Sequence, residues 1–361
     1  MTLPLSDHFN GKSFFQRHHE RALRRRDFWR WQLTTRRKPW PTRVPFVEQP
    51  APPRPRENEM IVTWIGHASF LIQTAHGNIL IDPVFSPRVS PFSWFGPKRV
   101  HPPGVAFEAL PPIHVVLLSH DHYDHCDIPT LRRVAAKHDP LFIAPLRHGD
   151  LLAAAGARRV IELDWWQTHR PFDGLELTLT PTKHWSNRLG RPRNYRLWGG
   201  FFLTMNSPPA APESSSGDTT RQRPATAPVP PRLWFAGDTG YDAEIFRAIR
   251  QRCGAPQLAL LPIGAYEPRW FMAPMHINPA EAVQVHQDID ADVSVAMHWG
   301  TFRLTDESRD DPLVDLEEAR LVAGITTTQF RVIAPGESLV LPRKDGPTEH
   351  RPRSGSNIMS T

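Results

Sequence analysis

Short apolar runs separated by turn-forming residues dominate the chain from residue 57 to about residue 340. The continuous apolar run at 114–118 predicts a strand that is buried on both faces. Similar runs predict further strands at 60–65, 69–73, 78–81, 175–180, 200–205, 233–236, 258–262, 294–297 and 330–332. Apolar residues at helical spacing predict helices over 129–137, 149–155, 243–250, 279–288 and 313–322. Strands and helices mixed along the chain indicate an α/β protein in which helices cover the sheets.

Residues 1–56 differ from the rest and are rich in arginine and aromatic side chains. Between Lys12 and Arg43, eleven Lys or Arg residues face two acidic ones, a balance of +9 against +6 for the whole chain. Apolar residues spaced seven apart predict one amphipathic helix over 14–33. This basic arm could pack on the main domain with a solvated arginine face, or it could contact an anionic membrane. No recognised binding motif accompanies the charge, so nucleic acid is not an expected partner.

The composition after the arm predicts one folded domain over 57–345. Residues 206–231 hold seven of the chain's 39 prolines together with Ser, Thr and Ala, which predicts a disordered surface insertion between two strands. The tail 346–361 is also expected to be disordered.

Cysteine usage and hydropathy point to a location inside the cell. Two cysteines, Cys126 and Cys253, are too few for a disulfide scaffold and fit a reducing compartment. No signal peptide is visible, and no stretch approaches the roughly 18 apolar residues of a membrane helix. We therefore expect a cytoplasmic protein, with peripheral membrane contact through the arm left open.

The strongest chemical signal is the segment Ser-His-Asp-His-Tyr-Asp-His at 119–125. It places His120, His122, Asp124 and His125 directly after the buried strand. Alternate residues of a loop that leaves a strand point the same way, so His120 and His122 can converge on one ion, while Asp124 and His125 turn toward a second. Imidazole and carboxylate ligands together suit zinc, with iron or manganese also open.

Single candidate ligands follow three further predicted strands. His184 comes after strand 175–180, Asp238 follows Leu-Trp-Phe-Ala-Gly, and His298 follows Val-Ser-Val-Ala-Met. Strand ends are where α/β proteins usually build their sites, so we expect these side chains to meet those of the histidine motif.

The order H-x-H-x-D-H, then His, then Asp in a Gly-Asp-Thr-Gly turn, then His resembles the metallo-β-lactamase superfamily. The resemblance implies a four-layer αββα sandwich and two divalent metal ions, with Asp238 bridging the two. The implied ligands are His120, His122 and His184 for the first ion and Asp124, His125 and His298 for the second.

The chain also resembles one branch of that superfamily, the N-acylphosphatidylethanolamine-hydrolysing phospholipase D and its bacterial relatives. The similarity runs from about residue 7 to residue 340, and the insertion at 206–231 departs from it. The motifs that carry it are D-H-F-N-G-K at 7–12, W-P at 40–41, T-W-I-G-H-A-S-F at 63–70, D-P at 82–83, H-W-S at 184–186, L-W-G-G-F at 197–201, A-G-D-T-G-Y at 236–241 and M-H-I-N-P at 275–279.

The resemblance implies a metal-dependent hydrolase in which Asp124, Asp238 and His276 take part in catalysis. His276 is expected to assist the leaving alcohol or to grip a substrate oxygen; its alternative role is to cap the helix that starts at Pro279. His67 and Asp82 are expected to support the ligands. Cys126 is interpreted as a buried structural thiol.

Three functions remain open at the level of sequence. A phosphodiesterase of phospholipase D type would act on a lipid or related diester through an apolar groove. A lactonase or other carbonyl-centred hydrolase would need only a small polar pocket. A non-enzymatic metal or nucleic-acid binding protein is least favoured, because a structural zinc needs only four closed ligands.

Overall fold

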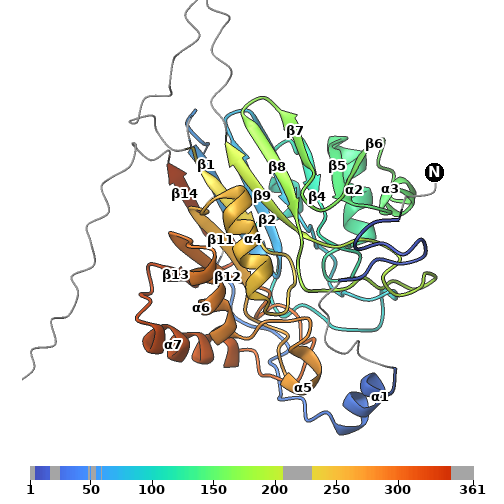
Figure 1. Cartoon of the computed structure of the whole chain (residues 1–361), viewed down its shortest axis with the longest axis vertical. Helices are drawn as coiled ribbons and strands as arrows, with labels where there is room; N and C mark the ends of the chain where they lie inside the picture. Colours follow the sequence, from blue (N-terminus) through green and yellow to red (C-terminus); the bar gives the residue numbers. More distant parts are fainter. Residues whose placement is uncertain are drawn as a thin grey trace, which may run out of the picture.

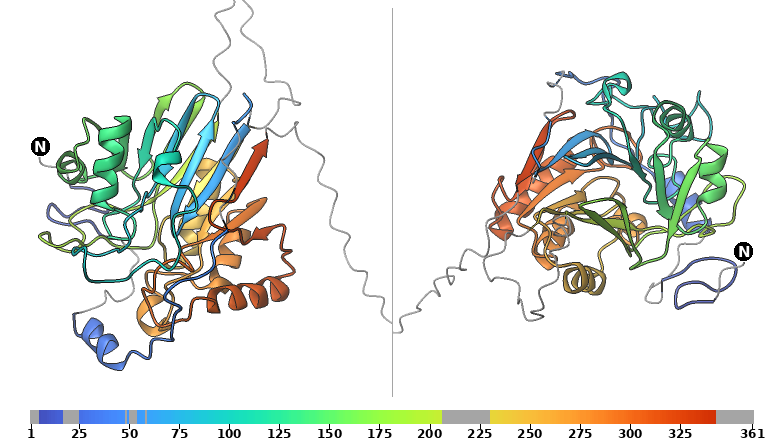
Figure 2. Two further views of the ribbon diagram at one scale, coloured as in Figure 1. Left: turned by 180° about the vertical axis from the view of Figure 1, so that it is seen from behind. Right: turned by 90° about the horizontal axis from the view of Figure 1, so that it is seen from above.

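The computed structural model describes residues 5–16, 25–47, 49, 54–57, 59–205 and 230–342. Two seven-stranded sheets lie face to face at its centre, and helices cover their outer sides (Figures 1 and 2). The predicted α/β sandwich with four layers is therefore confirmed. One large apolar cluster fills the space between the sheets, and it includes Trp64 and Phe70 from the first sheet and Trp234 from the second.

The first sheet has the strand order β14-β1-β2-β3-β4-β5-β6. Its pairs are antiparallel from β14 to β3 and parallel from β3 to β6, so the carboxyl ends of β3 and β4 reach the same edge. The bounds are β1 Glu59–Gly66, β2 Ser69–Thr74, β3 Gly77–Ile81, β4 Val115–Leu117, β5 Leu141–Pro145, β6 Arg159–Leu163 and β14 Ser338–Pro342.

The second sheet has the strand order β13-β12-β11-β10-β9-β8-β7. β10 to β13 are parallel, while β7 to β10 are antiparallel. The bounds are β7 Thr168–Phe172, β8 Leu175–Thr180, β9 Gly200–Met205, β10 Arg232–Phe235, β11 Leu258–Pro262, β12 Val293–Met297 and β13 Phe330–Arg331. β9 and β10 are antiparallel neighbours, so the insertion between them leaves the sheet at the end opposite Asp238. Disorder was predicted for 206–231 and for the tail 346–361; residues 206–229 and the tail lie outside the described residues, so this prediction is not tested there.

Helices pack on both outer faces of the sandwich. Leu131 and Val134 of α2 and Leu152 of α3 bury against the first sheet. Phe246 of α4 and Val283 of α6 bury in the large cluster on the side of the second sheet. The helix bounds are α1 Arg25–Thr34, α2 Ile128–His138, α3 Gly149–Ala154, α4 Ala243–Cys253, α5 Arg269–Met272, α6 Pro279–Asp288 and α7 Asp311–Ala323, with a short 3₁₀ turn at Phe107–Ala109.

The helix predicted over 14–33 is wrong at its start. Phe14 lies in a non-helical loop, where it forms a β-bridge with Phe9 and buries its ring against that residue, with 4.8 Å between the ring centroids. Within the described residues the helical part of the arm is α1. The pairing of two aromatic side chains across a tight loop therefore overrides the helical spacing.

The arm packs on the main domain through Trp31. Its ring stacks on Phe271 of α5 at 5.0 Å between centroids, and its indole N–H donates to Asp306 over 3.1 Å. Further along, the Trp40 indole donates to the carbonyl of Glu307 over 2.9 Å. None of the helices in the described parts of the chain is long and apolar enough to cross a membrane.

Candidate metal centre

Side chains from four strand ends meet at one edge of the sandwich. The loop that follows β4 carries His120, His122, Asp124 and His125, and all four lie at this edge. His184 follows β8, Asp238 follows β10 and His298 follows β12. The structure thus brings together all seven residues that the sequence singles out, within two adjacent clusters of ligand-type atoms.

The first cluster joins three histidine nitrogens and one carboxylate. His122 Nδ1 lies 2.9 Å from His120 Nε2 and 3.2 Å from His184 Nε2. Asp238 Oδ2 lies 3.9 Å from His120 Nε2 and 3.7 Å from His184 Nε2. Four ligands in a tetrahedron around zinc, at bonds of 2.0–2.1 Å, stand about 3.3 Å apart. The cluster therefore has the spacing of one tetrahedral metal site.

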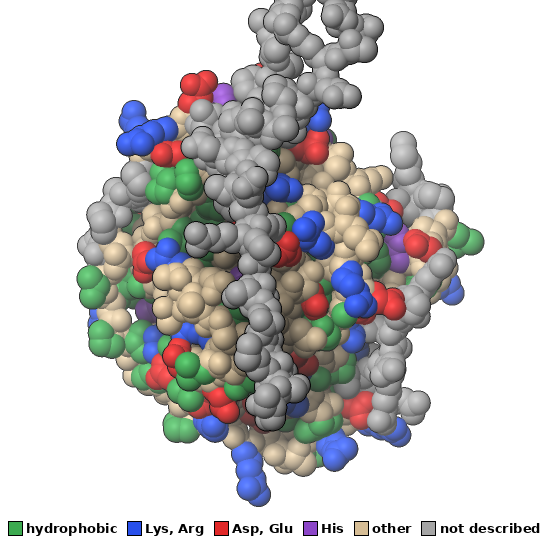
Figure 3. Space-filling model, turned by 60° about the vertical axis from the view of Figure 1, so that its left-hand side comes forward, with side chains coloured by type: hydrophobic (Ala, Val, Ile, Leu, Met, Phe, Trp, Pro, Cys, Tyr) green, Lys and Arg blue, Asp and Glu red, His purple; other side chains and the backbone are tan. Residues whose placement is uncertain are grey.

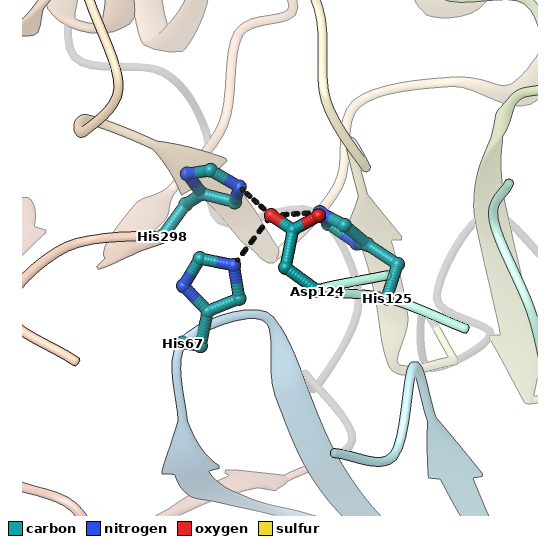
Figure 4. Close-up of side chains that lie close together, drawn as sticks. All are labelled: His67, Asp124, His125 and His298. Atoms are coloured by element: carbon teal, nitrogen blue, oxygen red, sulfur yellow. Dashed lines mark hydrogen bonds and ion pairs between the residues drawn. The ribbon is translucent and has the colours of Figure 1, made fainter. Parts of the chain in front are cut away.

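The second cluster centres on Asp124 and includes a residue from the turn between β1 and β2 (Figure 4). Asp124 Oδ2 lies 3.2 Å from His298 Nε2, 3.6 Å from His125 Nε2 and 2.9 Å from His67 Nε2. Asp238 reaches this cluster as well, with its Oδ2 3.2 Å from His125 Nε2. Asp238 thus touches both clusters, in keeping with the bridging role that the resemblance implies.

Hydrogen bonds behind the clusters orient the imidazole rings. Asp82 accepts from His125 Nδ1 over 2.7 Å and from the Ser119 hydroxyl. Because that hydroxyl donates to Asp82, its oxygen accepts from His120 Nδ1 at 2.9 Å. His184 Nδ1 donates to the carbonyl of Met275 over 2.9 Å. These contacts hold the rear nitrogen of each ring and turn its Nε2 toward the cluster, as in histidines that bind a metal.

The two clusters differ in their electrostatics. Burial lowers the pKa of His120 and of His184 well below the usual histidine value, which favours the neutral ligand form. Burial alone would raise the pKa of Asp238, but the charges of His125 and His298 outweigh it and hold the pKa well below the usual range. Burial opposes the charge of His298, yet Asp238 and Asp124 raise its pKa to about 9. Asp238 is thus ionised at neutral pH.

Buried polar atoms at the centre of the site fit a bound cation. His125 Nε2 and Asp238 Oδ1 lie buried without a hydrogen-bond partner among the described residues. Unpaired buried polar groups cost about 1–3 kcal/mol each, so a set of them signals a missing partner. Imidazole and carboxylate donors of this kind are those that zinc, iron and manganese accept.

His276 lies beside both clusters, in the loop between α5 and α6. Its Nδ1 is 3.9 Å from Asp238 Oδ2, and burial lowers its pKa to about 4. The alternative that His276 caps α6 is wrong, because Asn278 occupies the cap and forms a reciprocal capping box with Glu281.

Cys126 is fully buried behind the ligand loop, and burial raises its pKa to about 12, as expected of a structural thiol.

A cavity of about 960 Å³ opens over the clusters. Its floor includes His122, Asp124, Asp238 and His276, and its far wall is made by Phe28, Trp29 and Trp31 of α1 together with Phe271 and Met272 of α5. Tyr123, Trp185 and Arg193 also line it. Tyr123 and Trp185 stand inside the quoted motifs, but the sequence analysis gives none of these three residues a role in the site. The position of Trp185, directly after the ligand His184, could have indicated that it lies near the site. The residues of α1 and α5 reach the cavity only through tertiary packing, which the sequence pattern does not show.

Comparison with known proteins agrees with this geometry. Residues 77–299 match the family model described as the beta-lactamase superfamily domain. The chain is 33% identical to N-acyl-phosphatidylethanolamine-hydrolyzing phospholipase D 1 of Caenorhabditis elegans over 294 residues, which cover 78% of this chain and 76% of that protein. It is 26% identical to a metal-dependent hydrolase of Methanopyrus kandleri, over 77% of this chain and 99% of that protein.

Solved structures show the same fold at lower identity. A possible metal-dependent hydrolase from Veillonella parvula superposes with a TM-score of 0.57 at 15% identity, over 78% of this chain and 99% of that chain. The fold, the grouped ligand-type side chains and the family match agree. The chain therefore belongs to the metallo-β-lactamase superfamily and is a metal-dependent hydrolase.

Proposed function

We propose that the protein is a dinuclear-metal phosphodiesterase of phospholipase D type that acts on a lipid or a related diester. The observation that carries this proposal is the continuity of one cavity from the ligand clusters to the aromatic wall of α1 and α5. A substrate with a polar reacting group and an apolar chain fits a cavity that is polar at one end and aromatic at the other.

The relative from Caenorhabditis elegans supports the same substrate class. Its name describes hydrolysis of an N-acylated phosphatidylethanolamine, and it is 33% identical to this chain over 294 residues. The alternative function, a lactonase or other carbonyl-centred hydrolase, predicted a small polar pocket with no part for the arm. A cavity of about 960 Å³ with α1 in its wall favours the lipid diester.

The chain's own residues have separable tasks in this reaction. Metal ions, when bound, would supply a water of lowered pKa and an electrophile for the phosphoryl oxygen. Asp238 would hold both ions together, and Asp124 would tie the second ion to the ligand loop after β4. His276, within 3.9 Å of Asp238 and in the cavity, would hold a substrate oxygen or pass a proton to the leaving alcohol.

We also propose that α1 contacts an anionic membrane surface from which the lipid enters. Trp29 is 62% exposed and Phe28 is 44% exposed, although both line the cavity. Arg30 lies over the ring of Trp270, itself 44% exposed, at 4.7 Å. Aromatic side chains beside arginines suit the boundary between lipid headgroups and acyl chains. On the face seen in Figure 3, by contrast, basic and acidic side chains are interspersed.

Hydrolysis by the metal-loaded protein of a diester panel that includes N-acylphosphatidylethanolamine, beside a lactone panel, tests the proposal. The proposed function predicts diester turnover that Asp238→Asn abolishes. Lactone turnover without diester turnover would overturn it.

A further inference from the structure

A second cavity, of about 470 Å³, lies beside the catalytic cavity, and Tyr123 stands in the wall of both. The loop at 86–93 forms one side of this second cavity. The start of α2 and the side chain of Arg188 form the other sides. The proposed reaction gives none of the residues that line it a role.

Three arginines line the second cavity: Arg88, Arg132 and Arg188. Each of them donates to a main-chain carbonyl through one terminal nitrogen. Within the described residues, no other hydrogen bond and no ion pair engages the three guanidinium groups. Each therefore keeps N–H groups that a ligand can use.

One carboxylate, that of Asp127, lines the cavity as well, but it is already engaged. Its Oδ2 accepts from the Ser86 N–H over 2.9 Å and from the Thr130 hydroxyl over 2.6 Å. Its Oδ1 accepts from the Ser86 hydroxyl over 2.9 Å. Three guanidinium groups against one engaged carboxylate leave an excess of positive charge. Such a cavity attracts an anion, and guanidinium groups suit the oxygens of a phosphate group.

The loop that forms one side of the cavity also carries three exposed aromatic side chains. Phe92, Trp94 and Phe95 are 46%, 75% and 64% exposed. Their ring centroids lie 5.6 Å apart for the first two and 5.9 Å apart for the last two. The Val89 N–H donates to the Pro97 carbonyl over 3.1 Å and closes the loop behind them. Aromatic rings next to arginines suit the boundary between lipid headgroups and acyl chains.

We propose that the second cavity binds the phosphate group of an anionic phospholipid while the aromatic side chains at 92–95 enter the lipid interface. The bound lipid is not hydrolysed, because this site is separate from the ligand clusters. Val89 of the same loop lines the catalytic cavity together with Phe28 and Trp29 of α1. The headgroup site therefore adds a second membrane contact, distinct from α1, beside the cavity that the lipid substrate enters.

Binding of the metal-loaded protein to phosphatidylcholine vesicles with and without phosphatidylglycerol, measured by flotation, tests the site. We expect phosphatidylglycerol to strengthen binding and R132Q to weaken it about fivefold, the contribution of one basic side chain close to an anionic surface. W94A should weaken binding as well, because it removes an aromatic contact with the interface. R247Q is the matched control, because Arg247 is exposed on α4, which packs on the second sheet, and it lines neither cavity.

Three results would overturn the headgroup site. The first is equal vesicle binding by R132Q and the wild type, at equal metal content and melting temperature. The second is an equal loss in R132Q and R247Q, which would mean general attraction between charges. The third is weaker binding of inorganic phosphate by R132Q in calorimetry at unchanged vesicle binding, because the cavity would then take a free anion. The test involves no turnover, so a failure of the proposed diester hydrolysis would leave its outcome unchanged.

Discussion

Removing the Trp31 side chain should separate the lipid-binding part of the cavity from its chemistry. Trp31 is 7% exposed, stacks on Phe271 and donates to Asp306 over 3.1 Å. Burial of an aromatic side chain contributes about 1.5–3 kcal/mol and a neutral hydrogen bond about 1 kcal/mol. Trp31→Ala should therefore weaken the docking of α1 by about 2.5–4 kcal/mol, while Trp40 still anchors the chain beyond it.

The assay compares a long-chain diester with a short chromogenic diester. Loss of α1 from the cavity wall should raise KM for the long-chain diester at least about tenfold. KM for the short chromogenic diester should stay unchanged. Hydrogen exchange of the α1 amides reports the release of the helix directly. Leu33→Ala is the control, since Leu33 lies on the same helix, is 85% exposed and does not line the cavity. An unchanged long-chain KM despite a released α1 would refute the reasoning.

Three further outcomes follow from buried groups. Asp82→Asn removes the negative charge and one of the two acceptor oxygens that hold His125 Nδ1 and Ser119, and should weaken metal binding about 10- to 100-fold in a chelator competition; unchanged affinity would contradict the orienting role. Cys126, whose pKa burial raises to about 12, should resist alkylation at pH 8 until the protein is unfolded, as mass spectrometry would show. Burial lowers the pKa of His8, but its hydrogen bonds to Asp164 and Asp7 outweigh this and raise it above 6.5. The stabilisation is complete below pH 6.5 and is lost as pH rises through the raised value, so His8→Gln should lower the melting temperature more at pH 6 than at pH 9.

The ligand positions could be predicted because each follows an apolar run that had to be a buried strand. The order and direction of the strands in the two sheets bring the carboxyl ends of β4, β8, β10 and β12 to one edge of the sandwich. The contact of His67 agrees with its expected supporting role, because its Nε2 is hydrogen-bonded to Asp124 Oδ2 over 2.9 Å at the second cluster. Its left-handed backbone, with φ of 54°, aims the ring into the site and leaves no trace in the spacing.

The strands that sequence reasoning missed have weak local signals. β7, Thr168–Phe172, contains Pro171 and lies at the edge of its sheet, where burial is partial. β6 also lies at an edge and buries only Leu163 fully. β5 is a short run that ends in a proline, and β14 is defined by pairing with β1 from the other end of the chain. Such strands depend on partners distant in sequence, which single-sequence patterns do not report.

Two metal ions at these clusters are proposed to drive diester hydrolysis. Stepwise addition of zinc, iron or manganese to metal-stripped protein, with diester turnover followed beside metal content, tests this. Turnover should rise until two equivalents are bound per chain, and Asp238→Asn should reach neither the second equivalent nor the activity. Turnover that persists without metal, or that is complete at one equivalent, would contradict it.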